Sequence, residues 1–392
     1  MVYSPHAPAS GRHSRGRPPV PARKEHPTST VIFPLGPYHP ALPQPLALSL
    51  RLRGETITGA DAPATGFGHR GIADLVAGKP LEDALAIIER ACSHAHESHR
   101  LVVCQAIESA TGLTLSSSAR LTRTLFAEIE RILARFWTLG MAARAAGFPA
   151  PFQDAMERRE ILFDALETVT GERVYWAVSI RGGVRPDLDV APLRDPLTAL
   201  EPTVAAWRVL AGPKGSLGRA LRGAAPIPAE RADALGLTGL AARGSRILPD
   251  LRTTTPYAGY SDVTVPAPPS PDTLKGDVAS RLAVAVDDIG RSLTIALACV
   301  ESLVSGGVSR APGAASGQAT GRDGASTVEG PHGPVTATIT LAGDAAAVTR
   351  VRLEPPGAAN LAALPALLEG QPLAQAPVIL AGLDLCLECL DL

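Results

Sequence analysis

The sequence predicts a mainly α-helical protein with a small antiparallel β-sheet, an α+β fold. Between residues 80 and 170, and again at 274–305, apolar residues recur with the spacing of an amphipathic helix. Near both ends of the chain, apolar residues instead alternate with smaller or polar ones, which predicts strands. We therefore expect the N- and C-terminal strands to pack together in one sheet beside a helix bundle.

Length and charge limit the classes of protein to consider. The 392 residues suffice for a large core, and we expect one domain over 29–392. The formal net charge is -1, and no stripe of Lys and Arg with interleaved aromatic residues occurs, so nucleic acid is not an expected partner. Five cysteines without a secretory signal indicate a reducing compartment, where thiols serve as ligands or core residues rather than in disulfides.

The N-terminal region predicts a tail followed by strands. Residues 1–28 are rich in Pro and Arg and lack an apolar signal-peptide core, which predicts a disordered tail or a mis-assigned start codon. Over 46–52, leucines alternate with smaller or polar residues, and Gly54 is expected to turn the chain.

Helical spacing then covers most of the chain. We expect helices at 80–114, 116–145, after Pro151, around 199–210 and 228–236, and at 274–305. The last of these contains the most apolar stretch of the sequence, 282–304. Because charged residues such as Asp287, Asp288 and Arg291 interrupt it, we predict a buried amphipathic helix rather than a membrane span.

The C-terminal region begins with a loop and ends with cysteines. Gly, Ser and Ala dominate 305–325, which predicts a flexible loop. Two alternating runs around Gly343 and Asp344 predict a β-hairpin. A last helix near 360–369 leads to the cysteine pair that closes the chain.

Cys386 and Cys389 form a Cys-x-x-Cys pair, which brings two thiolates within reach of one metal ion, or of each other as a redox couple. Far upstream, Cys92, His96 and His99 occupy positions i, i+4 and i+7, which lie on one face if the segment is helical. These residues are candidate metal ligands. The alternatives are that the pair consists of small buried residues at a helix end, and that the upstream group is a remnant of a lost motif.

Other residues near these motifs have simpler interpretations. His94 falls on a different helical face from Cys92 and is expected to be solvated. Cys104 and Cys299 lie on apolar helix faces, which predicts that both are core residues.

Several blocks resemble a known family. They include GPYHPALPQPLALSLRLRGETITGADAPATGFGHRGI, CQAIESATG (104–112), AEIERILARFWTLG (127–140), RGGVRPDL (181–188) and VEGPHG (328–333). In this order they resemble the large subunits of energy-converting, membrane-bound [NiFe]-hydrogenases and the D subunit of NADH-quinone oxidoreductase, respiratory complex I. The resemblance implies a helical-bundle core of the [NiFe]-hydrogenase large-subunit type and the role of an oxidoreductase subunit.

In the hydrogenase branch of this family, four cysteines in two pairs hold a nickel–iron centre. Cys386 and Cys389 match the C-terminal pair, and Cys92 matches the first cysteine of the N-terminal pair, whose second position is Ala95. The resemblance thus implies a nickel–iron centre with an incomplete ligand set. Cys386 and Cys389 would be catalytic, and His96 and His99 are weaker candidate ligands.

In the complex I branch, the metal is absent and the cavity receives a quinone head group. The positions that match its two hydrogen-bonding residues are Pro43 and Ser93, so that pair is missing as well. His39, His69 and Arg70 match blocks shared by both branches, and we expect them at the cofactor-binding edge of the cavity. The alternative is that they join the N-terminal sheet to the bundle.

Two further positions depart from the family pattern. His332, in EGPHG, stands where a basic residue is expected, and Arg135 replaces the usual histidine of its helix.

The resemblance implies an electron-transferring large subunit beside a small iron–sulfur subunit. The complex is expected at the cytoplasmic face of a bacterial inner (plasma) membrane, with this chain attached peripherally through its partners. NAD and quinone, if used, would act at the level of the complex, since no G-x-G-x-x-G follows a strand in this chain. The competing hypothesis is a non-catalytic structural or docking subunit that has lost both the metal and the quinone site.

Overall fold

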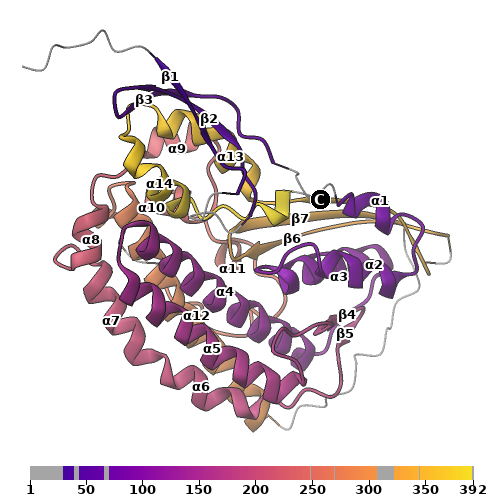
Figure 1. The fold of residues 1–392 in the computed structure, drawn as a ribbon. Helices are drawn as coiled ribbons and strands as arrows, with labels where there is room; N and C mark the ends of the chain where they lie inside the picture. The colour runs from indigo at the N-terminus through magenta and orange to yellow at the C-terminus, as the bar shows by residue number, and fades with distance from the viewer. Residues whose placement is uncertain are drawn as a thin grey trace, which may run out of the picture.

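The computed structural model describes residues 30–38, 44–65, 70–247, 249–268, 270–306, 322–343 and 345–390. α-Helices dominate these residues and are accompanied by three small antiparallel sheets, which confirms the predicted α+β class (Figure 1). The predicted tail at 1–28 lies outside the described residues.

The N-terminal sheet contains β1 (Val31–Leu35), β2 (Leu48–Arg53) and β3 (Thr56–Ala60), in that order. The alternation predicted for β2 is confirmed, because Leu48, Leu50 and Leu52 are buried while the residues between them are more accessible. The turn at Gly54 is confirmed too, with a φ of 62° that favours glycine. The buried leucines pack against helix α13 (Gly357–Leu368) in one hydrophobic cluster.

The segment predicted as one helix at 80–114 is two helices. After the short α1 (Ile72–Val76), α2 spans Leu81–Glu89 and α3 spans His96–Thr111. Ala95 is the N-cap of α3, with φ −142° and ψ 35°, so the backbone leaves the helical conformation between the two helices. This break places Cys92 in a loop rather than on a helix face.

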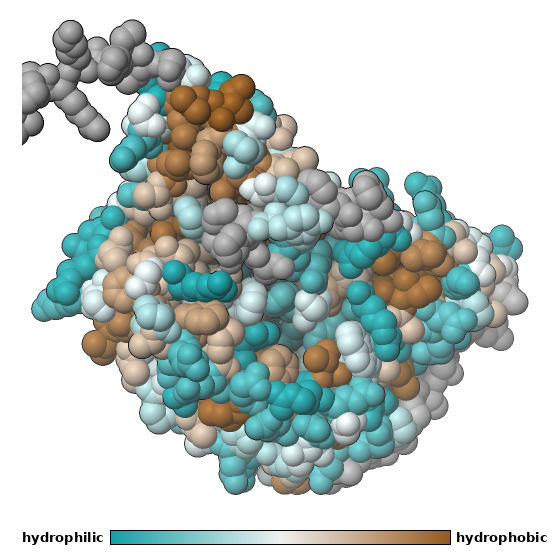
Figure 2. Space-filling model, viewed as in Figure 1, coloured by the Kyte–Doolittle hydropathy of each residue, from teal (hydrophilic) through white to brown (hydrophobic). Residues whose placement is uncertain are grey.

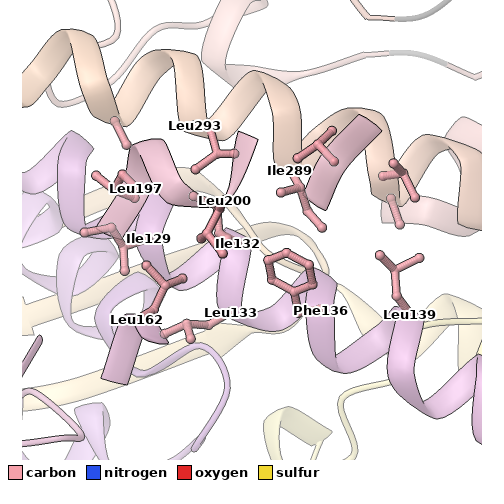
Figure 3. Packing of buried hydrophobic residues seen from close by; sticks show 14 of the residues in the cluster. Ile129, Ile132, Leu133, Phe136, Leu139, Leu162, Leu197, Leu200, Ile289 and Leu293 are labelled. Atoms are coloured by element: carbon pink, nitrogen blue, oxygen red, sulfur yellow. The ribbon is translucent and has the colours of Figure 1, made fainter. Parts of the chain in front are cut away.

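The bundle consists mainly of α4 (Ser117–Ala145), α5 (Pro149–Thr170) and α12 (Val278–Ser305), as predicted. Side-chain oxygens of Ser116 and Asp277 accept backbone N–H bonds at the starts of α4 and α12, which fixes where these helices begin. The faces of α4, α5 and α12 meet in a core that includes Ile129, Ile132, Phe136, Leu162, Ile289 and Leu293 (Figure 3). In the described part of the chain, no helix is long and apolar enough to cross a membrane.

Short elements connect α5 to α12. They are β4 (Ser179–Ile180), β5 (Gly183–Val184), η1 (Ala191–Leu193), α6 (Arg194–Ala199), α7 (Glu201–Ala211), α8 (Ser216–Leu221), α9 (Ala229–Ala234), α10 (Gly239–Gly244), α11 (Leu251–Thr254) and η2 (Pro271–Thr273). The helices predicted around 199–210 and 228–236 correspond to α7 and α9.

The C-terminal sheet contains β6 (Asp323–Gly330), β7 (Gly333–Leu341) and β8 (Val348–Glu354). β7 and β8 form the predicted hairpin, although Asp344 itself lies outside the described residues. The predicted flexible loop at 305–325 is partly wrong. Ser305 ends α12 and 323–325 begin β6, while 307–321 lie outside the described residues.

The expectation that terminal strands share one sheet is wrong. In the described residues, β1–β3 and β6–β8 form separate sheets, because the first packs on α13 and the second on α3. The N-terminal sheet still contacts a segment from the C-terminal region, and the two lie side by side in Figure 1. The backbone N–H of Ile57 donates to the Gln371 carbonyl at 2.9 Å, and that of Leu373 donates to the Glu55 carbonyl at 2.8 Å. The chain then continues through η3 (Leu373–Gln375), α14 (Ala376–Gly382) and η4 (Glu388–Leu390).

Candidate metal centre

Three cysteines from opposite ends of the chain converge in the interior. Cys92 lies in the loop between α2 and α3, and Cys386 and Cys389 lie between α14 and the end of η4. The Sγ atoms of Cys92 and Cys386 are 3.3 Å apart, those of Cys386 and Cys389 are 3.0 Å apart, and all three lie within 4.8 Å of one another. All three are buried, and this spacing suits thiolates that share one metal ion.

Ala95 completes this cluster in place of a fourth thiol. It is buried and packs with Cys92, Cys386 and Cys389 as one group. The fold therefore puts residue 95 where the second cysteine of an N-terminal pair would reach the site, but the side chain there is a methyl group.

The two candidate histidines have different surroundings. Nε2 of His99 lies 3.3 Å from Sγ of Cys389, so His99 borders the cysteine cluster. The ring of His96 packs on Tyr175 at a centroid distance of 4.5 Å and lies 3.7 Å from the Glu130 carboxylate. The prediction that Cys92, His96 and His99 share one helix face is therefore wrong. The helix begins only at His96, and the His96 ring is turned away from the cysteines.

His94 is also placed differently from the prediction. Its ring is partly buried, 5.1 Å from that of Trp137, and its backbone N–H donates to Sγ of Cys92 at 3.4 Å. No local pattern indicated the contact between the rings, because Trp137 lies on another helix.

Arg70 and Glu388 join the two cysteine-bearing loops. The Arg70 guanidinium donates to the Ala91 carbonyl at 2.8 Å and to the Glu388 carbonyl at 2.5 Å. The Glu388 carboxylate accepts from the backbone N–H of Ser93 at 2.6 Å and from its hydroxyl at 2.8 Å. Arg70 therefore lies at the edge of the site but contacts backbone, while His39 and His69 lie outside the described residues.

These contacts bear on the quinone alternative. Ser93, which matches one quinone-binding position, is already hydrogen-bonded to Glu388. Pro43, which matches the other position, lies outside the described residues.

The three thiols have unequal acidity without a metal. Hydrogen bonds from Cys389 and Cys92 lower the pKa of Cys386 to about 5. Burial raises the pKa of Cys92 to about 11. The hydrogen bond to Cys386, with burial, raises the pKa of Cys389 well above its ordinary value. Burial also lowers the pKa of His99, which favours a neutral imidazole with a free lone pair.

A small cavity adjoins the cluster. It has a volume of about 40 Å³ and is lined by Cys386, Trp137, Thr138, His332 and Asp384, among others. Such a volume has room for water.

Asp384 organises the polar side of this cavity. Its carboxylate accepts from the Thr138 hydroxyl at 2.5 Å and from Arg135 at 2.8 Å, and lies 3.2 Å from Nδ1 of His332. Burial opposes charge on both members of the pair, but their attraction outweighs it, so the pKa of Asp384 is lowered and that of His332 is raised. His332 and Arg135, which depart from the family pattern, thus share one carboxylate.

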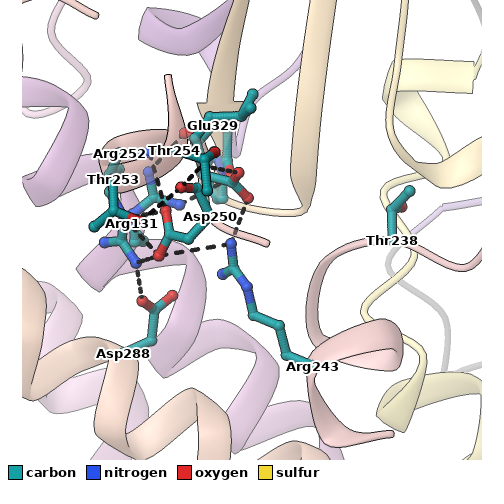
Figure 4. Close-up of polar contacts among 12 residues, drawn as sticks. Arg131, Thr238, Arg243, Asp250, Arg252, Thr253, Thr254, Asp288 and Glu329 are labelled. Atoms are coloured by element: carbon teal, nitrogen blue, oxygen red, sulfur yellow. Dashed lines mark hydrogen bonds and ion pairs between the residues drawn. The ribbon is translucent and has the colours of Figure 1, made fainter. Parts of the chain in front are cut away.

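A buried ionic network adjoins the site, and part of it is drawn in Figure 4. Arg252 contacts Asp288 at 2.7 Å, Asp250 at 2.8 Å and Glu128 at 3.1 Å. Arg135 joins this network to the site, since it contacts Asp288 at 3.0 Å as well as Asp384. The network holds five guanidiniums and five carboxylates, namely those of Arg131, Arg135, Arg243, Arg252, Arg291, Glu128, Asp250, Asp288, Glu329 and Asp384.

Sequence reasoning missed Asp384 and Glu388 as site residues. Both lie in the GLDLCLECLDL run, and their proximity to the cysteines was the available signal. Asp384 adopts a φ of 55°, a left-handed conformation that aspartate tolerates better than most residues. Cys104 and Cys299 are fully buried core residues, as predicted.

The residues present do not fit the four-thiolate nickel–iron centre that the resemblance implied. That centre takes two thiolates from each pair, and the Ala95 methyl group cannot ligate a metal. The donor set does fit a single soft ion bound by three thiolates.

Comparison with known proteins gives a consistent set of relatives. Residues 146–322 match the family model described as respiratory-chain NADH dehydrogenase, 49 Kd subunit. The chain is 29% identical to carbon monoxide-induced hydrogenase of Rhodospirillum rubrum, over 93% of this chain and 99% of that protein. It is 27% identical to membrane-bound hydrogenase subunit alpha of Pyrococcus furiosus, over 92% and 87%. It is 26% identical to the D subunit of NADH-quinone oxidoreductase of Salinibacter ruber, over 94% and 87%.

Proposed function

Since the chain belongs to the family that unites the large subunits of membrane-bound hydrogenases with the D subunit of NADH-quinone oxidoreductase, we propose that it is the electron-transferring large subunit of such a complex. Within it, Cys92, Cys386 and Cys389 hold metal, as a degenerate form of the nickel–iron site. The metal would supply redox or Lewis-acid chemistry when bound. Electrons would pass to or from an iron–sulfur cluster in a neighbouring small subunit.

One observation carries this proposal. Sulfur atoms converge from Cys92 and from Cys386, 294 residues further along the chain, and a methyl group occupies the matching fourth position. Packing alone does not require three thiol groups in contact, because three small apolar residues would fill the same space equally well. The arrangement instead supplies what a metal needs, namely sulfur ligands, a neutral imidazole nearby and supporting hydrogen bonds.

We propose that partner subunits attach the chain to the membrane. Apolar side chains gather on the surface over the N-terminal sheet (Figure 2), where the exposed fractions of Val31 and Ile32 are 55% and 70%. Exposed apolar groups of this kind are typical of surfaces that bind another protein. The chain would thereby lie at the cytoplasmic face of a bacterial inner membrane, and NAD and quinone, if used, would bind within the complex.

The proposal is tested in the intact complex. The Cys386→Ser/Cys389→Ser variant should lower electron transfer about tenfold or more, because the thiolates cannot be replaced by hydroxyls as ligands for a soft metal. Both hydrogen-dependent reduction of a viologen dye and NADH-dependent reduction of a short-chain quinone should be measured. The matched control is Cys104→Ala/Cys299→Ala, which removes two buried thiols outside the site and should leave the rate unchanged.

A second candidate function is a non-catalytic docking subunit. It is favoured by Ala95 at a ligand position and by the engagement of Ser93 with Glu388. On this hypothesis the Ser variant would assemble normally and transfer electrons at the unaltered rate in both assays. That outcome would refute the catalytic proposal.

A further inference from the structure

We propose that the site formed by Cys92, Cys386 and Cys389 binds one thiophilic divalent ion, zinc in the first place, through three thiolates, with a fourth position left for a water-sized ligand. This replaces the binuclear nickel–iron centre of the family. It rests on the proposed function only in taking these cysteines as metal ligands, and it holds for a catalytic and for a structural subunit alike.

The number of sulfur atoms falls one short of the nickel–iron centre and suits a single ion. That centre uses four thiolates, whereas this cluster contains three. Here residue 95, which would supply the fourth sulfur, is an alanine buried against the same three residues, and its methyl group cannot ligate a metal. Three Sγ atoms within 4.8 Å of one another surround one ion, and among the described residues of this cluster nothing remains to hold a second.

A divalent ion is consistent with the burial of the cluster. Three buried sulfurs can all ionise only with a positive charge among them, since burial of unpaired charge is costly. A divalent ion bound between the sulfurs would supply that charge.

His99 acts as a positioning residue in this arrangement. Its Nε2 lies 3.3 Å from Cys389 Sγ, within reach of a hydrogen bond to the sulfur. His99 is absent from the set of ligand atoms that all lie within 4.8 Å of one another. A hydrogen bond to a ligating sulfur orients it and adjusts its electron density without adding a ligand.

The adjoining cavity supplies room for the fourth ligand. Cys386 contributes to its wall, together with polar groups that include Thr138, His332 and Asp384. Its volume of about 40 Å³ exceeds what one water needs. Three protein ligands and an open position distinguish reactive zinc sites from closed structural ones.

The test uses the full-length chain, purified with and without its complex, and measures nickel, iron and zinc per chain. We expect about one zinc per chain in the isolated subunit, and no nickel. Cys92→Ser and Cys386→Ser should each lower zinc content about tenfold or more, while Cys104→Ala should leave it unchanged. Nickel with iron at one each per chain, or a Cys386–Cys389 disulfide in place of metal, would overturn the proposal.

Cobalt substitution tests the coordination number independently of activity. With Co²⁺ bound, sulfur-to-metal charge-transfer absorption reports the number of thiolates. Ala95→Cys should raise this absorption by about a third, since a fourth thiolate joins three. Added cyanide should change the wild-type spectrum and not that of Ala95→Cys. Identical spectra for the two proteins, or no response to cyanide in the wild type, would refute the open position.

The outcomes separate this inference from the proposed function. Zinc bound as expected, with electron transfer unaffected by Cys386→Ser/Cys389→Ser, would retain the metal site and refute the catalytic role. Nickel and iron bound, with electron transfer lost in that variant, would do the reverse.

Discussion

Removal of the Arg252 guanidinium should destabilise the chain severely. Arg252 is fully buried, and its three carboxylate partners lie at 2.7 to 3.1 Å. Arg252→Met removes the one guanidinium that Glu128, Asp250 and Asp288 share, so these buried carboxylates lose part of their counter-charge. Breaking a buried ion pair from one side costs about 3–5 kcal/mol, a large part of the stability of a typical domain.

Thermal unfolding of the purified chain measures this effect. For a chain of 392 residues, we expect the midpoint to fall by about 4–6 °C. The matched control is Arg194→Met, which breaks an ion pair with Glu301 at 2.6 Å whose side chains are more than half exposed. That change should cost less than about 1 kcal/mol, because solvent screens the pair.

A double variant separates charge from packing. Arg252→Met with Asp288→Asn restores equal numbers of guanidiniums and carboxylates, so it should recover part of the lost stability. If Arg252→Met shifts the midpoint no further than Arg194→Met, or if the double variant is additive, the argument from charge balance is wrong.

Three further predictions concern pH, packing and the site. Burial raises the pKa of Glu97 and Glu130 to about 8, so the folded chain retains protons that the unfolded chain releases. The free energy of unfolding should therefore fall as the pH rises from about 5 to about 8. In urea titrations at several pH values, Glu130→Gln should remove about half of this pH dependence. An unchanged pH dependence in that variant would contradict the prediction. Phe136→Ala should cost about 3–5 kcal/mol in the same titrations, since this α4 side chain is fully buried in the core that α4 forms with α12. A loss below about 1 kcal/mol would mean that the core collapses around the cavity left by the ring. Arg70→Gln should loosen the contact between the two cysteine loops and speed alkylation of Cys386 in the metal-free chain, as followed by mass spectrometry; an unaltered rate would show that Ser93 and Glu388 hold the loops by themselves.

Local pattern was sufficient to predict much of the secondary structure. α4, α5 and α12 follow the helical spacing of their apolar residues, and the side-chain caps Ser116 and Asp277 were present in the sequence. The β7–β8 hairpin follows from alternation around a turn. These features depend on residues a few positions apart, where the backbone geometry of a helix or strand fixes which side chains share a face.

The cysteine pair and the substitution at residue 95 were also evident from sequence. The sequence could not decide which other side chains the fold brings next to the cysteines and Ala95. The break before His96 sends one histidine toward Tyr175 and leaves His99 beside Cys389. Likewise Asp384 and Glu388 acquire roles only because Arg135 and Ser93 approach from elsewhere in the chain.

The same reason explains the separate sheets. Alternation showed that strands at both ends each have one buried face, but it carries no information about the surface that covers that face. The tertiary structure places α13 on the first sheet and α3 on the second, so each sheet buries its apolar side without the other. Sequence alone thus determined the apolar faces of the main helices and strands and the atoms that can ligate a metal. Only packing between distant parts of the chain determined which of them meet.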